Sequence, residues 1–275
     1  MYLLSTGKEN NVLKLFFGLF IALSVWWLSI FLRGLTEGME NDLFTLTYPI
    51  ISLIGGLAGL VYARKWGGFK SKLGLTITML SFGLLAQFLG QLLYNFYIFV
   101  LDIPEPYPSI GDASYFASVI FYIFGAYYLT KVIGLRFSLK SIRGKFLAVI
   151  IPALILVGSY LLLLRGYEFD FSDKIILFLD FGFPIGQAIF VSFAILAWVM
   201  SADVLGGMMR KPIILLISAL VFQYFADFFY SYQFSINAEN MYVGDYLDFL
   251  YFVSYFYMSW ALFSIGNMFY KVQES

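Results

Sequence analysis

Residues 11–33 read NVLKLFFGLFIALSVWWLSIFLR, in which only Lys14 and Arg33 carry a charge. A helix that crosses a membrane needs about 20 predominantly apolar residues, so this run is long enough to span a bilayer. It is longer than the apolar part of a signal peptide and lacks a small-x-small cleavage site, which predicts that the helix is retained. The stretch therefore indicates an integral membrane protein.

Seven further apolar runs follow along the chain. Composition agrees, because 61% of the residues are hydrophobic and only 12% are charged, whereas about 25% are charged in soluble domains. The sequence therefore predicts an all-α integral membrane protein with eight transmembrane helices. The predicted spans are Asn11–Arg33, Leu43–Arg64, Leu73–Leu101, Asp112–Gly134, Phe146–Leu164, Lys174–Ser201, Pro212–Phe234 and Asp245–Tyr270.

The chain contains no Cys and no His, and its formal net charge is zero. Without these residues there are no disulfides, thiolate nucleophiles, Ser-His-Asp triads, or zinc and haem sites with His or Cys ligands. A net charge of zero gives no reason to expect a nucleic-acid partner. We therefore predict no cofactor and no metal ion, and a chemistry limited to carboxylate, amide, hydroxyl and aromatic groups.

Lys and Arg residues predict the orientation of the spans, because cytoplasmic loops carry an excess of them. With the N-terminus inside, only Arg33, Arg165 and Lys174 fall on the outer side, and all other Lys and Arg residues fall on the cytoplasmic side. Most acidic residues show the reverse distribution. We therefore expect a multi-pass protein of the cell membrane with both termini in the cytoplasm.

Four pairs of segments match in chain order and at nearly constant separation, which predicts that a four-helix unit occurs twice. The first repeat covers residues 1–140 and the second 141–275, within one membrane domain. Because each unit has an even number of helices, both copies have the same orientation, related by a two-fold axis along the membrane normal. The pairs are FLRG (31–34) with LLRG (163–166), TYP (47–49) with GFP (182–184), LLAQFLGQLLYNFY (84–97) with LVFQYFADFFYSY (220–232), and GDASYFASVIFYIFGAYYL (111–129) with GDYLDFLYFVSYFYMSWAL (244–262).

Polar residues recur at helical spacing inside several spans and concentrate toward the outer side. Such residues are costly in lipid and normally face the interior of a bundle. The stripes predict an outward-facing polar interior that binds a ligand, while the alternative is that they only hold the helices together by hydrogen bonds. The candidate ligand-binding residues are Gln87, Gln91, Tyr94, Asp112, Tyr115, Asp180, Gln223, Asp227, Tyr230, Asp245 and Asp248.

Three of the acidic residues carry specific expectations. Asp227 lies well inside a span, so we expect it to be protonated or paired with Arg33 or Arg165. Asp112 and Asp245 each follow a Gly and open a helix, where an acid accepts hydrogen bonds from free backbone N–H groups. The alternative is a hard-cation site of oxygen ligands on the outer side. That site would combine Asp102, Glu105, Asp112, Glu239, Asp245 and Asp248.

Prolines and glycines occupy matching places in the two predicted repeats. Pro49 and Pro184 lie inside spans, where each should kink its helix and free the carbonyl group four residues before it. Transporters use such breaks for substrate or ion contacts, and packing alone explains them equally well. Gly55 with Gly59 and Gly182 with Gly186 are small-xxx-small pairs, which favour close helix contacts.

One segment of the chain has a familiar pattern: Pro106-Tyr107-Pro108-Ser109, followed by Asp112 and Tyr115. With residues 89–129 around it, this pattern resembles the multi-helix membrane regions that precede cytoplasmic output domains in bacterial diguanylate cyclases and some histidine kinases. Residues 226–262 are similar to the second half of those regions. This sequence includes no output domain, and Gln91 stands where such regions often carry Asp. The resemblance implies a free-standing sensing or ligand-binding membrane module, and no cyclase or kinase activity is expected from it.

Three functions are consistent with these features. The first is a membrane sensor that binds a small or lipid-like ligand from the outer side and signals to a cytoplasmic or membrane protein partner by helix shifts. The second is a transporter of small molecules or ions. The third is a lipid hydrolase in which Asp227 forms an acid/base pair with Asp245 or Asp248. We favour the sensor because of the resemblance and the outward polar stripe. The stripe fades toward the cytoplasm, as at Ile123–Ala126, which argues against a transporter.

Overall fold

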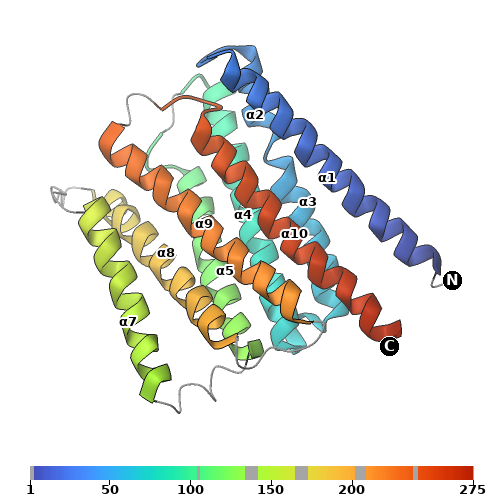
Figure 1. Ribbon diagram of the computed structural model, residues 1–275. Coiled ribbons are helices and arrows are strands. Elements are labelled where there is room, and N and C mark those ends of the chain that lie inside the picture. Colours follow the sequence, from blue (N-terminus) through green and yellow to red (C-terminus); the bar gives the residue numbers. More distant parts are fainter. Residues whose placement is uncertain are drawn as a thin grey trace.

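Long helices make up most of the part of the chain that the structure describes, namely residues 3–103, 106–133, 142–164, 173–201, 209–237 and 241–274. These ranges contain no strand, so the prediction of an all-α protein is confirmed for them. The structure is a computed structural model, drawn in Figure 1. Its elements are α1 (Leu3–Leu32), α2 (Met39–Thr47), α3 (Ile50–Lys65), η1 (Gly68–Lys70), α4 (Lys72–Phe99), α5 (Ile110–Ile133), α7 (Ile142–Ser159), η2 (Tyr160–Leu164), α8 (Lys174–Ser201), α9 (Arg210–Asn237) and α10 (Tyr246–Glu274).

Within the described ranges, seven helical segments are long and apolar enough to cross a membrane. They support a multi-pass membrane protein and agree with seven of the eight predicted spans. The other predicted span, Phe146–Leu164, corresponds to α7 and η2, whose apolar stretch Val149–Leu162 is shorter. The seven segments are Asn11–Leu32, Met39–Lys65, Lys72–Phe99, Ile110–Ile133, Lys174–Val199, Arg210–Ile236 and Tyr246–Tyr270.

Six helices form a closed ring in which each packs against the next. The order around the ring is α3, α4, α5, α8, α9 and α10, and α10 packs back against α3. The remaining two long helices lie at opposite edges of the bundle in Figure 1, α1 against α10 and α7 against α8. The polar candidates on α4, α5, α9 and α10 therefore belong to one ring.

Glycines make two of the contacts in this ring especially close, as the small-xxx-small pairs predict. A Cβ atom at Gly55 of α3 would lie 1.8 Å from Ser259 Oγ of α10, and one at Gly59 would meet Ser81 of α4. On the other side, a Cβ atom at Gly186 of α8 would lie 2.5 Å from Val119 of α5. These distances are below van der Waals contact, so the backbones approach this closely only because glycine has no side chain.

The second predicted span is divided at Tyr48 and Pro49 into α2 and α3. Proline has no N–H group to donate to Thr45, whose carbonyl oxygen therefore loses its partner within the helix. Asn95 of α4 replaces that partner, with its Nδ2 atom 3.2 Å from Thr45 O. By contrast, α8 continues through Pro184 as a single helix. Only the first of the two expected breaks thus divides its helix.

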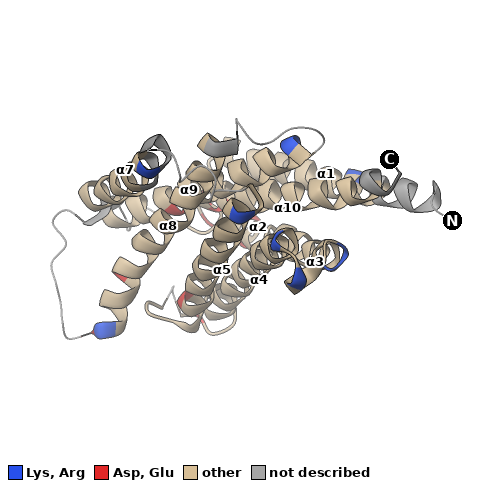
Figure 2. Cartoon of the chain, turned by 90° about the horizontal axis from the view of Figure 1, so that it is seen from below, with Lys and Arg blue, Asp and Glu red and all other residues tan. Residues whose placement is uncertain are grey.

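The two ends of the bundle differ in charge. The ends of α3 and α5 and the starts of α4, α7 and α9 carry Lys and Arg, and Figure 2 views the chain from this side. The opposite end carries most of the acidic residues. Between the ends, the half of the ring nearer the basic end is mostly apolar, and the buried hydroxyl groups of Thr76, Thr78 and Ser81 there bond carbonyl groups of their own helix. The fully buried side chains of this half include Ile77, Leu80, Leu84, Leu129, Leu216, Leu220, Met258 and Leu262.

Candidate functional site

The half of the ring nearer the acidic end contains a connected set of hydrogen bonds centred on Tyr48, the residue before the break in the second span. The Tyr48 hydroxyl donates to Asp248 Oδ1 of α10 at 2.7 Å and lies 3.1 Å from Gln91 Oε1 of α4. Tyr115 of α5 donates to the same Gln91 oxygen at 2.6 Å. Asp248 Oδ2 also accepts from the Gly244 N–H and lies 3.3 Å from Thr45 Oγ1. Four segments of the ring thus meet at one point.

Asp112 stabilises the start of α5, as the first expectation for this residue proposes. Its Oδ2 atom accepts from the Ser109 N–H at 2.7 Å, and the Asp112 N–H in turn lies 3.3 Å from Ser109 Oγ. This reciprocal pair is a capping box. The Tyr94 hydroxyl of α4 donates to the other carboxylate oxygen at 2.7 Å. Both carboxylate oxygens of Asp112 therefore accept hydrogen bonds from protein groups.

Asp245 plays a similar part at the start of α10. Its Oδ1 atom accepts from the N–H groups of Leu247 at 2.8 Å and Asp248 at 3.2 Å, which is the geometry of an N-cap. Among the described residues, no three acidic side chains are grouped closely enough to hold a metal ion. Glu105 and Glu239 of the alternative hard-cation site lie outside the described residues. The helix-capping interpretation is the one that the contacts support.

A second layer of polar contacts lies deeper, near the middle of α4 and α5. Gln87 donates through Nε2 to Ser118 Oγ at 2.9 Å, and its Oε1 atom accepts from the Tyr255 hydroxyl of α10 at 3.0 Å. All three residues are buried. We call Gln87, Ser118 and Tyr255 the Gln87 centre. Both the nitrogen and the oxygen of its amide bond side chains from other helices, which agrees with the alternative that the polar residues hold the helices together.

The matching position on α9 forms a different centre. Gln223 donates through Nε2 to Asp227 Oδ1 at 2.9 Å, and Ser254 of α10 donates to Gln223 Oε1 at 2.7 Å. Asp227 faces the interior, with 5% of its surface exposed. Its Oδ2 atom and the hydroxyl oxygen of the fully buried Tyr122 both lack a hydrogen-bond partner. We call Gln223, Asp227, Ser254 and Tyr122 the Gln223 centre.

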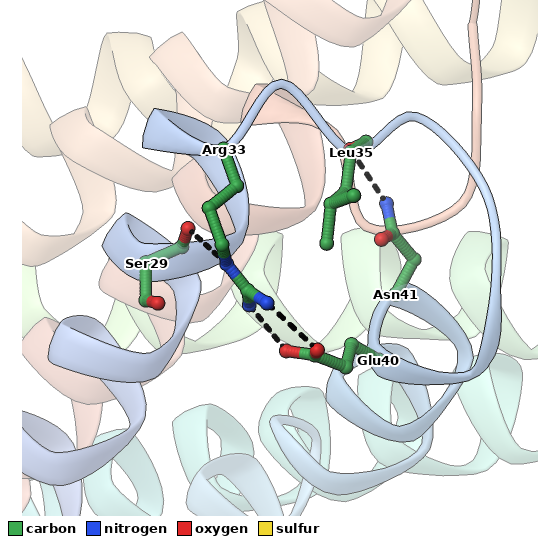
Figure 3. Close-up of polar contacts among 5 residues, drawn as sticks. All are labelled: Ser29, Arg33, Leu35, Glu40 and Asn41. Atoms are coloured by element: carbon green, nitrogen blue, oxygen red, sulfur yellow. Dashed lines mark hydrogen bonds and ion pairs between the residues drawn. The ribbon is translucent and has the colours of Figure 1, made fainter.

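Of the alternatives expected for Asp227, protonation or pairing with Arg33 or Arg165, the structure excludes pairing with Arg33. Arg33 instead makes a bidentate ion pair with Glu40 in the connection between α1 and α2, and its Nε atom donates to the Ser29 carbonyl at 3.0 Å (Figure 3). The connection between α1 and α2 is short, so it places Glu40 beside Arg33 and away from the interior of the ring. The other proposed partner, Arg165, lies outside the described residues.

Six tyrosine rings surround the polar interior. Successive ring centroids lie 5.8 Å apart for Tyr94 and Tyr115, 6.1 Å for Tyr48 and Tyr255, 6.0 Å for Tyr255 and Tyr251, and 5.9 Å for Tyr251 and Tyr230. Four members, Tyr94, Tyr115, Tyr230 and Tyr251, are partly exposed, as are Gln91 and Asp248, whereas Gln87, Gln223 and Asp227 are buried. Accessibility thus decreases with depth.

Most predicted site residues meet in this interior, but Asp180 does not join the hydrogen bonds described above. Its Oδ1 atom accepts a hydrogen bond from the hydroxyl group of Tyr107, a residue between α4 and α5. Sequence reasoning missed Tyr48, Ser254 and Asn95. A signal for Tyr48 was its place beside Pro49, because the residue next to a helix break can direct its side chain inward. Of the three carboxylates in the hydrolase alternative, Asp227 bonds Gln223, Asp248 bonds Tyr48, and Asp245 bonds backbone N–H groups at the start of α10.

Comparisons of the chain with protein-family models, with curated proteins and with solved structures give no match.

Proposed function

We propose that this protein is a membrane sensor that binds a small or lipid-like ligand in the polar half of its helix ring and signals through a protein partner. One observation carries the proposal: the hydrogen-bonded interior is partly accessible near the acidic end and ends in unpaired, buried polar atoms at Asp227 and Tyr122. Buried polar groups in proteins are normally paired, so unpaired ones indicate a missing partner. A ligand that enters from the acidic end would supply it.

The orientation and the repeat are part of this proposal. Basic residues at one end favour a cytoplasmic location for that end and for both termini, which leaves the polar half facing outward. Two further observations support a duplicated four-helix unit. α3 packs against α10 as α8 packs against α5, and glycine pairs lie at both contacts. A ligand at the interface between the repeats would touch both, so its binding could shift one relative to the other.

A transporter is the second candidate, because the divided second span resembles the broken helices at transporter sites. The apolar half of the ring argues against it, since fully buried Leu84, Leu220 and Leu262 lie between the polar interior and the basic end. A proteoliposome assay separates the two functions. Uptake of the bound ligand that Asp227→Asn abolishes would favour transport, whereas binding without uptake would favour the sensor.

The sensor proposal is tested by native mass spectrometry of full-length protein released from mild detergent. We expect a discrete bound mass in the wild type that is lost in Gln91→Met, because methionine keeps the volume but removes the oxygen that accepts from Tyr115. Gln233→Met makes the same substitution near the end of α9 and should retain the mass. An unliganded mass in every variant, with no stabilisation by any ligand class, would contradict the proposal.

A further inference from the structure

The charges of the polar interior restrict the chemistry of a ligand. Asp112, Asp227 and Asp248 all lie in it, and each bonds only neutral groups in the contacts above. Of the basic residues near the acidic end, Arg33 is held by Glu40, and Lys174 is exposed at the start of α8. The described interior therefore has carboxylates and no cation among its hydrogen-bonded groups.

The three carboxylates differ in whether both of their oxygen atoms have a hydrogen-bond partner. Asp112 and Asp248 each use both oxygens in hydrogen bonds with protein groups. Asp227 uses only Oδ1, and its Oδ2 atom has no partner although the residue is 5% exposed. An unpaired oxygen of a buried carboxylate is costly unless the group is protonated or a donor reaches it, and a positively charged donor forms the stronger bond. Asp227 is thus the one carboxylate of the three with an oxygen that lacks a hydrogen-bond partner, although the Tyr251 hydroxyl lies close to this carboxylate.

Hydroxyl groups and aromatic rings surround this carboxylate. The hydroxyl groups of Tyr122 from α5 and of Tyr251 and Tyr255 from α10 lie near Asp227. The Tyr122 hydroxyl is itself unpaired. Toward the acidic end the six tyrosine rings follow. Rings attract cations through their faces, and proteins bind organic ammonium groups in cages of aromatic side chains.

We propose that the ligand of this site is a protonated amine, whose ammonium group donates to Asp227 Oδ2 and lies against the tyrosine rings. This inference rests on the proposed function and specifies the ligand class. The ammonium group brings the positive charge that Asp227 lacks, and its N–H groups pair Asp227 Oδ2 and the Tyr122 hydroxyl oxygen. The amine can be a soluble molecule or the headgroup of a lipid, because both sources carry the same ammonium chemistry.

The test is the thermal stability of the full-length protein in nanodiscs with probes matched in size. Butylammonium and phenethylammonium are each compared with their neutral alcohol and with a carboxylate of the same length, and sodium chloride serves as the salt control. We expect the ammonium probes alone to raise Tm, by about 4 °C at saturation. Nanodiscs of phosphatidylethanolamine compared with phosphatidylglycerol test the lipid source, and a higher Tm only in the former would assign the headgroup as the ligand.

Variants assign the effect to the site. Asp227→Asn should abolish the shift, and Asp180→Asn, which changes a carboxylate bonded to Tyr107, should keep it. If Asp227→Asn does not fold, Tyr122→Phe is the variant that tests the site. It removes one acceptor of the ammonium group and should reduce the affinity for the ammonium probes about fivefold. The comparison of probes on the wild type requires no variant at all.

The remaining outcomes separate this inference from the proposed function. Equal shifts with the neutral or anionic probes, or with sodium chloride, would overturn the amine and leave a binding site in place. If no probe or lipid changes Tm and native spectra show a bound mass without an amine, the amine is likewise overturned. If no probe acts and the spectra show only unliganded protein, both proposals fail.

Discussion

The helices α3–α5 and α8–α10 pack alike but differ in their polar centres. In each set the middle helix carries a buried glutamine near its midpoint, Gln87 on α4 and Gln223 on α9. At the Gln87 centre the amide bonds Ser118 and Tyr255, and no atom of these three is left unpaired. At the Gln223 centre the amide is also bonded, yet Asp227 Oδ2 and the Tyr122 hydroxyl are left over.

The difference separates a structural polar contact from a candidate binding site. Tyr122 and Tyr255 occupy matching positions in GDASYFASVIFYIFGAYYL and GDYLDFLYFVSYFYMSWAL, and both are fully buried. Only Tyr255 has an amide oxygen to bond. Pairing a buried group stabilises the fold, whereas leaving one unpaired is costly in the absence of a ligand. Substitutions at the two centres should therefore have unequal effects.

The largest effect is expected where the two sets of helices are alike. Gly55→Ala places a Cβ atom 3.1 Å from Ser259 Cα, so α10 must move, and Gly186→Ala places one 2.5 Å from Val119 Cγ1. We expect losses of about 3 and about 2 kcal/mol in the free energy of unfolding. Unfolding in detergent by increasing denaturant measures both. Gly158→Ala, with nothing within 4 Å, is the control and should cost nothing.

The next effect concerns the satisfied centre. Gln87→Leu removes both polar ends of the amide, which leaves the Tyr255 hydroxyl without a partner and Ser118 with only its bond to the Tyr115 carbonyl. We expect a loss of about 2 kcal/mol, because two buried hydrogen bonds are lost and the Tyr255 hydroxyl is left unpaired. Thermal unfolding followed by circular dichroism gives the value. A stability equal to that of the wild type would mean that the Gln87 centre does not support the ring.

A smaller effect is expected for Tyr255→Phe. The variant keeps the ring and removes the hydroxyl that donates to Gln87 Oε1 at 3.0 Å. One buried oxygen loses its donor, which should lower the stability by about 1 kcal/mol. The same unfolding experiment measures it. No loss, or a gain, would show that Gln87 finds another donor.

The smallest effect is expected for the matching substitution Tyr122→Phe. Its hydroxyl has no partner in the protein, so without ligand the change should lie within about 0.5 kcal/mol of the wild type or stabilise the fold. The pair Tyr122→Phe and Tyr255→Phe is therefore a matched test of the comparison. Losses of the same size for both variants would remove the distinction between the two centres.

Much of this arrangement was predictable from the sequence, and the reasons are physical. Apolar runs of membrane-spanning length predict helices directly, and the spacing of Gln223, Asp227 and Tyr230 predicts one polar face on α9. Glycine pairs predict close contacts because only glycine permits them. The partners were not predictable, since pairings such as Gln87 with Tyr255 depend on which helices are neighbours in the ring. Arg33 is an example, because its depth in the membrane made it a possible partner of Asp227. Its depth does not show that Glu40 lies nearer to it.

The central claim, that the Gln223 centre is completed by a ligand, is tested most directly by an experimental structure of the protein in nanodiscs with butylammonium present. We predict density for a non-protein group within hydrogen-bond distance of both Asp227 Oδ2 and the Tyr122 hydroxyl, and none beside Gln87. A direct hydrogen bond between Asp227 and Tyr122, with no density for a ligand, would contradict the account.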